Sequence, residues 1–374
     1  MRRLLGFGLV LGLAATGGAC KDSPSPVDFT DPAAISANLS AVDSTFDNDV
    51  YRGFNVATAR LSAATSAPVG GGSAALLQMA QPQLRQNGGR IFLPNLLQAA
   101  KLQQALPNLS VAAAQGRIIP DSIIGRVFQW DTTLHEYTWQ DSVVAGLNGV
   151  RFILYATDVE GAVVEPVVAV GTLDIIDQST TSKLQLEVLV QGLGGTPSYV
   201  DYTASLTVGA TTATATANGF ISNGKSGADG KTLTFDQTFS VRPTGATVNA
   251  TFALNNPAIT LAMYESVAFS DPNIVITADF RLVQNGSTIR TVGRITLNTA
   301  TDSTTMHVAV SLDGHPVASI DGDPSNPGTQ WVDAGGQPLS IDDLAALDHL
   351  FAVWEHFQEA VTGLFAPIST FATL

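Results

Sequence analysis

One segment of the sequence matches the letters of a phosphate-binding loop. Residues 219–226 read Gly-Phe-Ile-Ser-Asn-Gly-Lys-Ser, the pattern G-x-x-x-x-G-K-S. A working loop of this type needs a helix that begins at the lysine, because the amides of the helix N-terminus bind the phosphate. Here turn residues follow Lys225, and a strand pattern begins at Lys231. The segment therefore predicts a hairpin loop and argues against a nucleotide site.

Candidate metal ligands are present but poorly spaced. Residues 321–326 begin like a calcium loop, yet Asn326 stands where the turn glycine belongs and Val332 where the bidentate glutamate belongs. His349 and His356 lie seven residues apart, whereas a zinc pair on a helix needs four. We expect no cofactor, although weak calcium binding at residues 321–326 by another geometry stays open.

No catalytic constellation follows from the spacing of the polar residues. There is no G-x-S-x-G nucleophile elbow. A carboxylate pair for glycoside hydrolysis can come from distant strands, so a hydrolase stays open but ranks last. The single cysteine, Cys20, excludes an internal disulfide, a CxxC redox pair and a thiolate zinc site.

The N-terminus has the layout of an export signal. Residues 1–19 hold a basic start, Arg2 and Arg3, followed by an apolar run from Leu4 to Ala15. This run of about a dozen residues is shorter than the about 20 that cross a bilayer as a helix. We therefore expect residues 1–19 to be a cleaved signal peptide.

Cys20 stands directly after this signal and after Gly17-Gly18-Ala19. The arrangement resembles the lipobox of bacterial lipoproteins, although Gly17 occupies a place where an aliphatic residue is usual. The resemblance implies lipid on Cys20, a polar tether over residues 20–30, and an extracytoplasmic protein anchored to a bacterial membrane, inner or outer. The alternative is an ordinary signal-peptidase site that leaves Cys20 as a thiol.

The charge of the chain restricts its partners. The formal net charge is −14, and loss of Arg2 and Arg3 with the signal lowers it by two, to −16. Such an acidic body argues against nucleic acid and against anionic headgroups held by charge.

The secondary structure predicted for the chain changes from helices near the N-terminus to strands and then to a C-terminal helix. Residues 31–117 predict a helical region, with Gly53 and residues 68–72 as breaks and further helices near 73–86 and 94–106. The first apolar stripe consists of Ile35, Leu39, Val42, Phe46, Val50 and Phe54.

Residues 118–335 alternate apolar and polar side chains, which predicts strands with one buried face. Turn pairs such as Asn285-Gly286 and Asp313-Gly314 separate the runs. We expect an antiparallel meander of about ten strands. The alternation is clearest in 182–190, 199–208, 231–241, 246–254, 259–269, 274–283, 288–297 and 304–312.

Residues 336–374 predict a long C-terminal helix. Ser340 and Asp343 form a capping-box-like start. The apolar stripe that follows consists of Ile341, Leu344, Leu347, Phe351, Trp354, Val361 and Phe365. The predicted fold is one α+β domain, mainly antiparallel β, in which N-terminal helices and the C-terminal helix pack on a large curved sheet.

Three classes of function fit this fold. A curved sheet covered by helices resembles, in architecture only, the half-open sheets of periplasmic lipoprotein carriers, which implies a lipid or other hydrophobic ligand. We predict that the ligand would contact Phe235, Phe239, Phe252, Phe280 and Trp354. The alternatives are a structural or surface-interaction lipoprotein without a small ligand and, third, the extracytoplasmic hydrolase.

Overall fold

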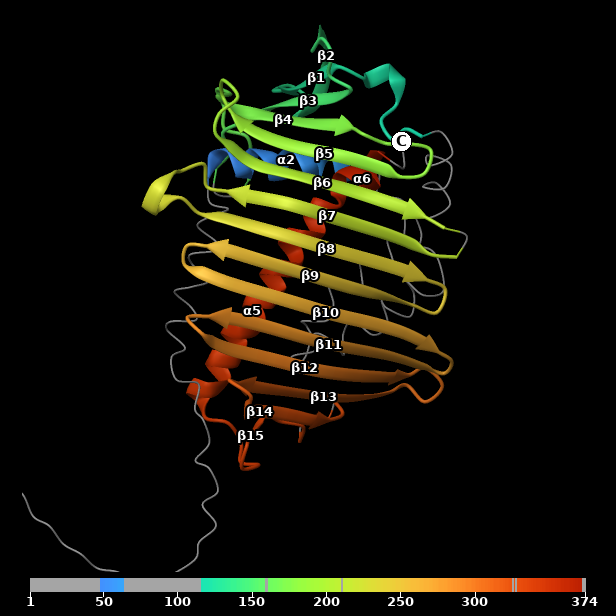
Figure 1. Ribbon diagram of the computed structural model, residues 1–374, viewed down its shortest axis with the longest axis vertical. Coiled ribbons are helices and arrows are strands. Elements are labelled where there is room, and N and C mark those ends of the chain that lie inside the picture. The colour runs from blue at the N-terminus through green and yellow to red at the C-terminus, as the bar shows by residue number, and fades with distance from the viewer. Residues whose placement is uncertain are drawn as a thin grey trace, which may run out of the picture.

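The computed structural model describes residues 48–63, 116–158, 161–209, 211–324, 326 and 328–371. Most of them form one open, mainly antiparallel sheet of fifteen strands (Figure 1). The strands are β1 Arg126–Asp131, β2 Glu136–Val143, β3 Gly149–Tyr155, β4 Ala169–Asp177, β5 Leu184–Gly192, β6 Ser198–Val208, β7 Ala213–Ser222, β8 Thr232–Arg242, β9 Gly245–Asn255, β10 Ala258–Ser270, β11 Asn273–Gln284, β12 Ser287–Asn298, β13 Ser303–Leu312, β14 His315–Gly322 and β15 Val332–Asp333.

The prediction of about ten strands is wrong, because several strands lack clean alternation. Strand β2 is the last strand of the sheet and is mostly exposed on both faces. Its sequence therefore shows no sustained alternation of apolar and polar residues that would mark it as a strand. Strand β7 alternates alanine with threonine at its start, which gives only a weak hydrophobic signal. The eight runs with the clearest alternation each coincide with a strand, from β5 and β6 to β8–β13.

Strands β3 to β15 pair in chain order, each with the next, and all of these pairs are antiparallel. The residues predicted to form tight turns have left-handed backbone conformations. Asn285 and Gly286 have φ values of 50° and 85°, and Asp313 and Gly314 have 50° and 83°. Positive φ at both central residues is the geometry that favours tight hairpins.

The sheet departs from this order at one end. Strand β1 lies between β2 and β3, pairing antiparallel with β2 and, through two residue pairs, parallel with β3. Phe128, Tyr137 and Phe152 from these three strands pack together, with ring centroids 4.6 Å and 5.4 Å apart. This aromatic cluster stabilises the irregular end of the sheet.

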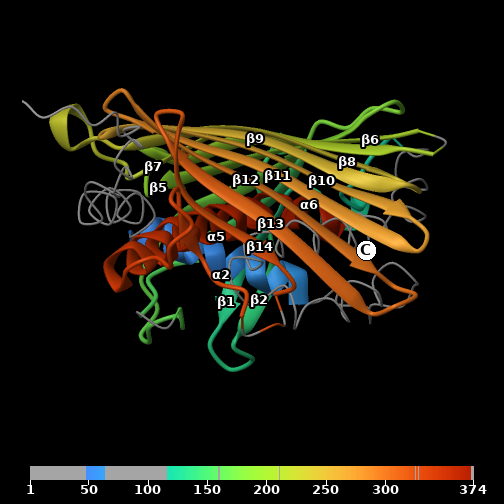
Figure 2. The ribbon, with the colours of Figure 1, turned by 90° about the horizontal axis from the view of Figure 1, so that it is seen from below.

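The described residues include three α-helices, which lie on the same side of the sheet (Figure 2). They are α2 Asp49–Ala63, α5 Ile341–Leu364 and α6 Ala366–Phe371. Asn48 caps α2 by accepting a hydrogen bond from the Tyr51 amide, at 2.8 Å. The predicted stretches 31–47, 73–86 and 94–106, and the signal and tether that include Cys20, lie outside the described residues.

The expected helix break at Gly53 does not occur, since Gly53 lies inside α2. A Cβ atom at this position would lie 3.0 Å from the carbonyl oxygen of Tyr155 and 3.3 Å from Cβ of Leu154, both in β3. The glycine therefore lets α2 approach the backbone of β3 closely.

Helix α5 begins as its capping residues predict. The Ser340 hydroxyl accepts a hydrogen bond from the Asp343 amide at 3.1 Å and donates one to the Asp343 carboxylate at 2.6 Å. The apolar stripe is buried only from the second turn onward, because Ile341 is 85% exposed and Leu344 is 39% exposed. Leu347, Leu350 and Phe351 are buried.

Candidate functional site

The five residues predicted to contact a ligand all lie on the face of the sheet that α5 crosses. Phe235 and Phe239 come from β8, Phe252 from β9, Phe280 from β11 and Trp354 from α5. Each is at most 4% exposed. The fold therefore gathers these aromatic side chains in one buried layer.

Within this layer the aromatic residues form two pairs. Phe235 lies directly opposite Phe252 in the register of β8 and β9. Phe280 stacks on Trp354, with ring centroids 5.0 Å apart and an interplanar angle of 27°. Phe239 lies opposite Val248 and joins neither pair. The Phe280–Trp354 pair is one of the contacts between the sheet and α5.

Sequence reasoning missed Tyr202 of β6. Its ring centroid is 5.8 Å from that of Phe235, and its hydroxyl donates a hydrogen bond to the carbonyl oxygen of Leu364 at 2.9 Å. Burial raises the pKa of the Tyr202 phenol, so the group stays neutral and keeps donating. This bond holds the C-terminal end of α5 on the sheet.

Polar side chains interrupt the apolar layer at a few positions. Gln237, Glu265, Thr291 and Thr304 are 1–4% exposed on the same face. A signal for them existed in the sequence, because each occupies the apolar phase of its strand, as Gln237 does between Phe235 and Phe239. The buried face is therefore not uniformly apolar.

The register places two of these polar residues in one row with Phe280. Residues directly opposite one another across β8 to β12 are Gln237, Ala250, Met263, Phe280 and Thr291. Thr291 is thus the direct neighbour of Phe280, whereas Gln237 lies three strands away, at about 14 Å for a strand spacing of about 4.8 Å.

The buried polar atoms without a hydrogen-bond partner among the described residues include three in this layer. They are Oε1 of Gln237, Oγ1 of Thr291 and Nε1 of Trp354. A buried hydroxyl or amide without a partner costs about 1–3 kcal/mol, and such groups in native proteins call for an explanation such as bound water or a ligand. Two of the three atoms lie beside Phe280.

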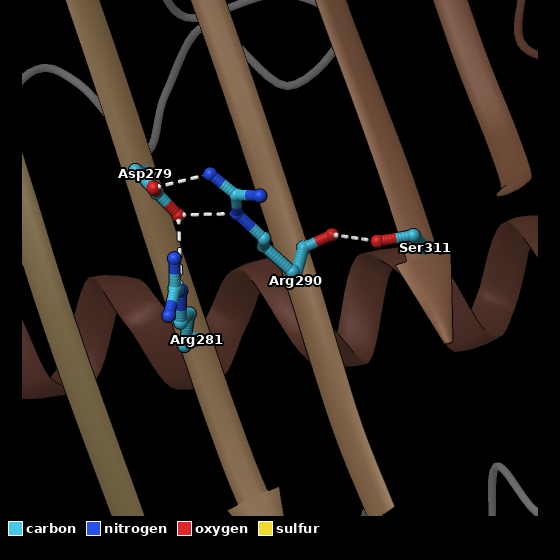
Figure 3. Close-up of polar contacts among 4 residues, drawn as sticks. All are labelled: Asp279, Arg281, Arg290 and Ser311. Atoms are coloured by element: carbon cyan, nitrogen blue, oxygen red, sulfur yellow. Dashed lines mark hydrogen bonds and ion pairs between the residues drawn. The ribbon is translucent and has the colours of Figure 1, made fainter. Parts of the chain in front are cut away.

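The opposite face of the sheet carries a charged cluster (Figure 3). The Arg290 guanidinium donates two hydrogen bonds to the Asp279 carboxylate, at 2.8 Å and 2.6 Å, and Arg281 lies 3.7 Å from the same carboxylate. The hydrogen bonds from Arg290 lower the pKa of Asp279. Ser311 donates to the Arg290 carbonyl oxygen at 3.4 Å.

This cluster has a structural explanation. Arg281 and Arg290 lie directly opposite each other on β11 and β12, and like charges in that position destabilise a strand pair. Asp279 is the diagonal neighbour of Arg290 and offsets the repulsion between the two arginines. The cluster therefore supports the strand register.

The phosphate-loop pattern lies at the hairpin that joins β7 to β8. Residues 219–222 of the phosphate-loop pattern belong to β7, and the Lys225 amide donates to the side chain of Asn223 at 3.1 Å. Only a three-residue turn of 3-10 helix, Gly227–Asp229, precedes β8. Among the described residues, no group of three or more His, Cys, Asp or Glu side chains is arranged to hold a metal ion.

The described part of the chain contains no helix that is both long and apolar enough to cross a membrane. Comparisons with known proteins add no functional assignment. No protein-family model, no curated protein and no solved structure matches this chain. The candidate site is therefore the buried layer around Phe280 and Trp354, defined by this chain's own residues.

Proposed function

We propose that this protein is a membrane-anchored extracytoplasmic lipoprotein that binds a hydrophobic ligand between the sheet and helix α5. The observation that carries the proposal is the buried face itself. Strands β5 to β14 direct apolar side chains to one face, and α5 meets this face through aromatic rings. Apolar ligand sites in proteins are lined in this way, with a few polar groups that orient the ligand.

The proposed binding mode requires movement of the helix, because the aromatic side chains are buried. A ligand that reaches Phe280 must displace Trp354, its stacking partner. A second ring contact holds α5 nearby, since Phe351 packs on Trp331 with centroids 5.7 Å apart. Each aromatic pair contributes about 0.5–1.5 kcal/mol beyond its buried area, so an acyl chain that buries several methylenes, at about 0.8 kcal/mol each, offsets the loss of one pair.

Native mass spectrometry tests the binding function. The full-length chain is purified from bacterial membranes in a mild detergent and compared with the same protein after delipidation. We expect added mass in the range of a lipid that disappears on delipidation. A bare protein mass from the gentle preparation contradicts a ligand-binding role.

The anchor is tested separately through Cys20. Cells grown with a radioactive fatty acid should label the wild-type chain, and the Cys20→Ala variant should carry no label. An unlabelled wild-type chain contradicts the anchor and leaves the ligand-binding proposal to be judged on the mass spectra alone.

A structural or surface-interaction lipoprotein is the second candidate. The observation in its favour is the close burial of the five predicted ligand contacts, which are already packed against protein. The same mass spectra separate the two candidates, because a structural lipoprotein gives no ligand mass before or after delipidation.

A further inference from the structure

One long edge of the sheet is open. Strand β2 is the last strand at its end of the sheet, and among the described residues it pairs as a strand with β1 alone (Figure 1). The opposite end is blunted, because β15 contributes only two residues and the neighbouring β14 contains Pro316, which has no amide to donate. Strand β2 contains neither proline nor lysine, the residues that commonly protect an edge. It therefore presents backbone N–H and C=O groups with which a further strand can pair.

The part of β2 that suits such pairing is its regular stretch, Glu136–Gln140. The register with β1 is continuous over these residues and shifts only beyond Gln140. Along the stretch Tyr137 and Trp139 share one face, and Thr138 lies on the other. Trp139 is 50% exposed, and Thr138 is partly exposed. The open edge thus carries an exposed aromatic ring and an accessible hydroxyl.

The residues of this stretch match those of a second copy. In an antiparallel pairing with a two-fold axis at Thr138, each Thr138 lies opposite its counterpart. Tyr137 then lies opposite Trp139 of the second copy, and Glu136 lies opposite Gln140. Threonine pairs and aromatic pairs stabilise antiparallel strands, whereas like charges directly opposite each other destabilise them. This register makes the first two kinds of pair and avoids the third, while an axis at Glu136 would bring two carboxylates together.

The charge of the whole chain opposes this contact. Each copy has a formal net charge of −14. Glu136 is the only charged residue of the regular stretch and faces an uncharged amide in this register. Exposed charges more than about 8 Å apart are largely screened at physiological ionic strength. Association should therefore strengthen as the salt concentration rises, which is the opposite of what a contact held by ion pairs would do.

We propose that two copies of this chain associate through β2, so that their sheets join in a two-fold antiparallel pairing centred on Thr138. Such a pairing uses the same edge of both copies, so it closes on itself and the assembly stops at two. The inference goes beyond the proposed function and depends neither on a hydrophobic ligand nor on lipid at Cys20.

The oligomeric state tests the contact. The full-length chain, purified in a mild detergent, is measured by native mass spectrometry over a range of protein and ammonium acetate concentrations. We expect a dimer whose fraction rises with protein concentration and with salt. A chain that stays monomeric throughout, a dimer that dissociates as salt is added, or assemblies larger than two overturn the proposal.

Thr138→Lys is the variant that should weaken the dimer. It replaces the threonine pair at the two-fold axis by two like charges, so the dissociation constant should rise by about tenfold. Thr238→Lys is the matched control, because Thr238 is also partly exposed but lies in β8, an interior strand. Circular dichroism checks that both variants fold. Equal dimerisation of the two variants places the contact on another surface and overturns the proposal.

Cysteine cross-linking tests the register without Thr138→Lys. Glu136→Cys and Gln140→Cys are each made together with Cys20→Ala, so that each chain carries a single thiol. In the proposed register position 136 lies opposite position 140 of the second copy, whereas the two copies of position 136 lie about 14 Å apart, since four residues of a strand span about 13.6 Å. Cα atoms more than about 7 Å apart do not form a disulfide.

We therefore expect disulfide-linked dimers when the two cysteine variants are mixed and oxidised, and none in either variant alone. No cross-link in the mixture, or a cross-link within either variant alone, overturns the pairing centred on Thr138.

Discussion

Replacing Thr291 by valine should stabilise the delipidated protein. The Thr291 side chain is 1% exposed on β12, and no hydrogen-bond partner for its hydroxyl lies in the described part of the chain. Valine has a similar shape and no hydroxyl, so the change removes a desolvated polar group without opening a cavity. The cost of such a group is about 1–3 kcal/mol, and the free energy of unfolding should rise by an amount within that range.

Urea unfolding followed by circular dichroism measures the change. With a urea slope of about 1–3 kcal/mol per molar, a gain of about 1 kcal/mol moves the midpoint upward by about 0.3–1 M at unchanged slope. The protein must be delipidated first, because a bound ligand would itself stabilise the folded state and obscure the comparison.

Thr304→Val is the matched control for this measurement. Thr304 is 4% exposed on the same face, in β13, but its side chain or backbone has an interaction partner. Its replacement should leave the midpoint unchanged or lower it. If Thr291→Val lowers the midpoint as well, the Thr291 hydroxyl has a partner in the ligand-free protein, and the reasoning that treats it as an unsatisfied buried group is refuted.

Three further changes probe the scaffold around the site. Asp177→Ala should lower the free energy of unfolding by about 2–4 kcal/mol in urea, because one carboxylate oxygen accepts two consecutive buried backbone amides, at 2.8 Å and 2.9 Å, and both would lose their partner. Asp279→Asn should lower the free energy of unfolding by about 0.5–1 kcal/mol at pH 7. Since Arg290 lowers the folded-state pKa of Asp279, its contribution is present above the unfolded pKa of about 4 and is lost as pH falls through the folded pKa, so urea midpoints of variant and wild type should converge in acid. Gly53→Leu should lower the melting temperature, although helix propensity alone would raise it, because a Cβ atom would lie 3.0 Å from the Tyr155 carbonyl oxygen.

Local features of the fold follow from the sequence because they depend on neighbouring residues. The Asn285-Gly286 and Asp313-Gly314 turns adopt the left-handed geometry that their residue types favour. Ser340 and Asp343 start α5 for the same reason, since capping involves residues only three apart. Alternation within a strand likewise identifies its buried face before any partner is known.

The polar residues on that buried face show what alternation along a strand cannot predict. Thr291 and Glu265 occupy apolar phases in their strands, and this much is visible in the sequence. Whether a side chain in that phase gains a partner depends on what lies across the layer, and this is decided by residues far away along the chain.

The sequence by itself therefore determined a mainly antiparallel β body, its turns, its buried faces and the start of the last helix. Only the tertiary structure decided the fifteen-stranded order, the parallel contact of β1 with β3 and the stacking of Trp354 on Phe280. The physical reason is separation along the chain. Turns and caps form between neighbours, whereas the site around Phe280 is assembled by packing free energy shared among strands and a helix that are distant in sequence.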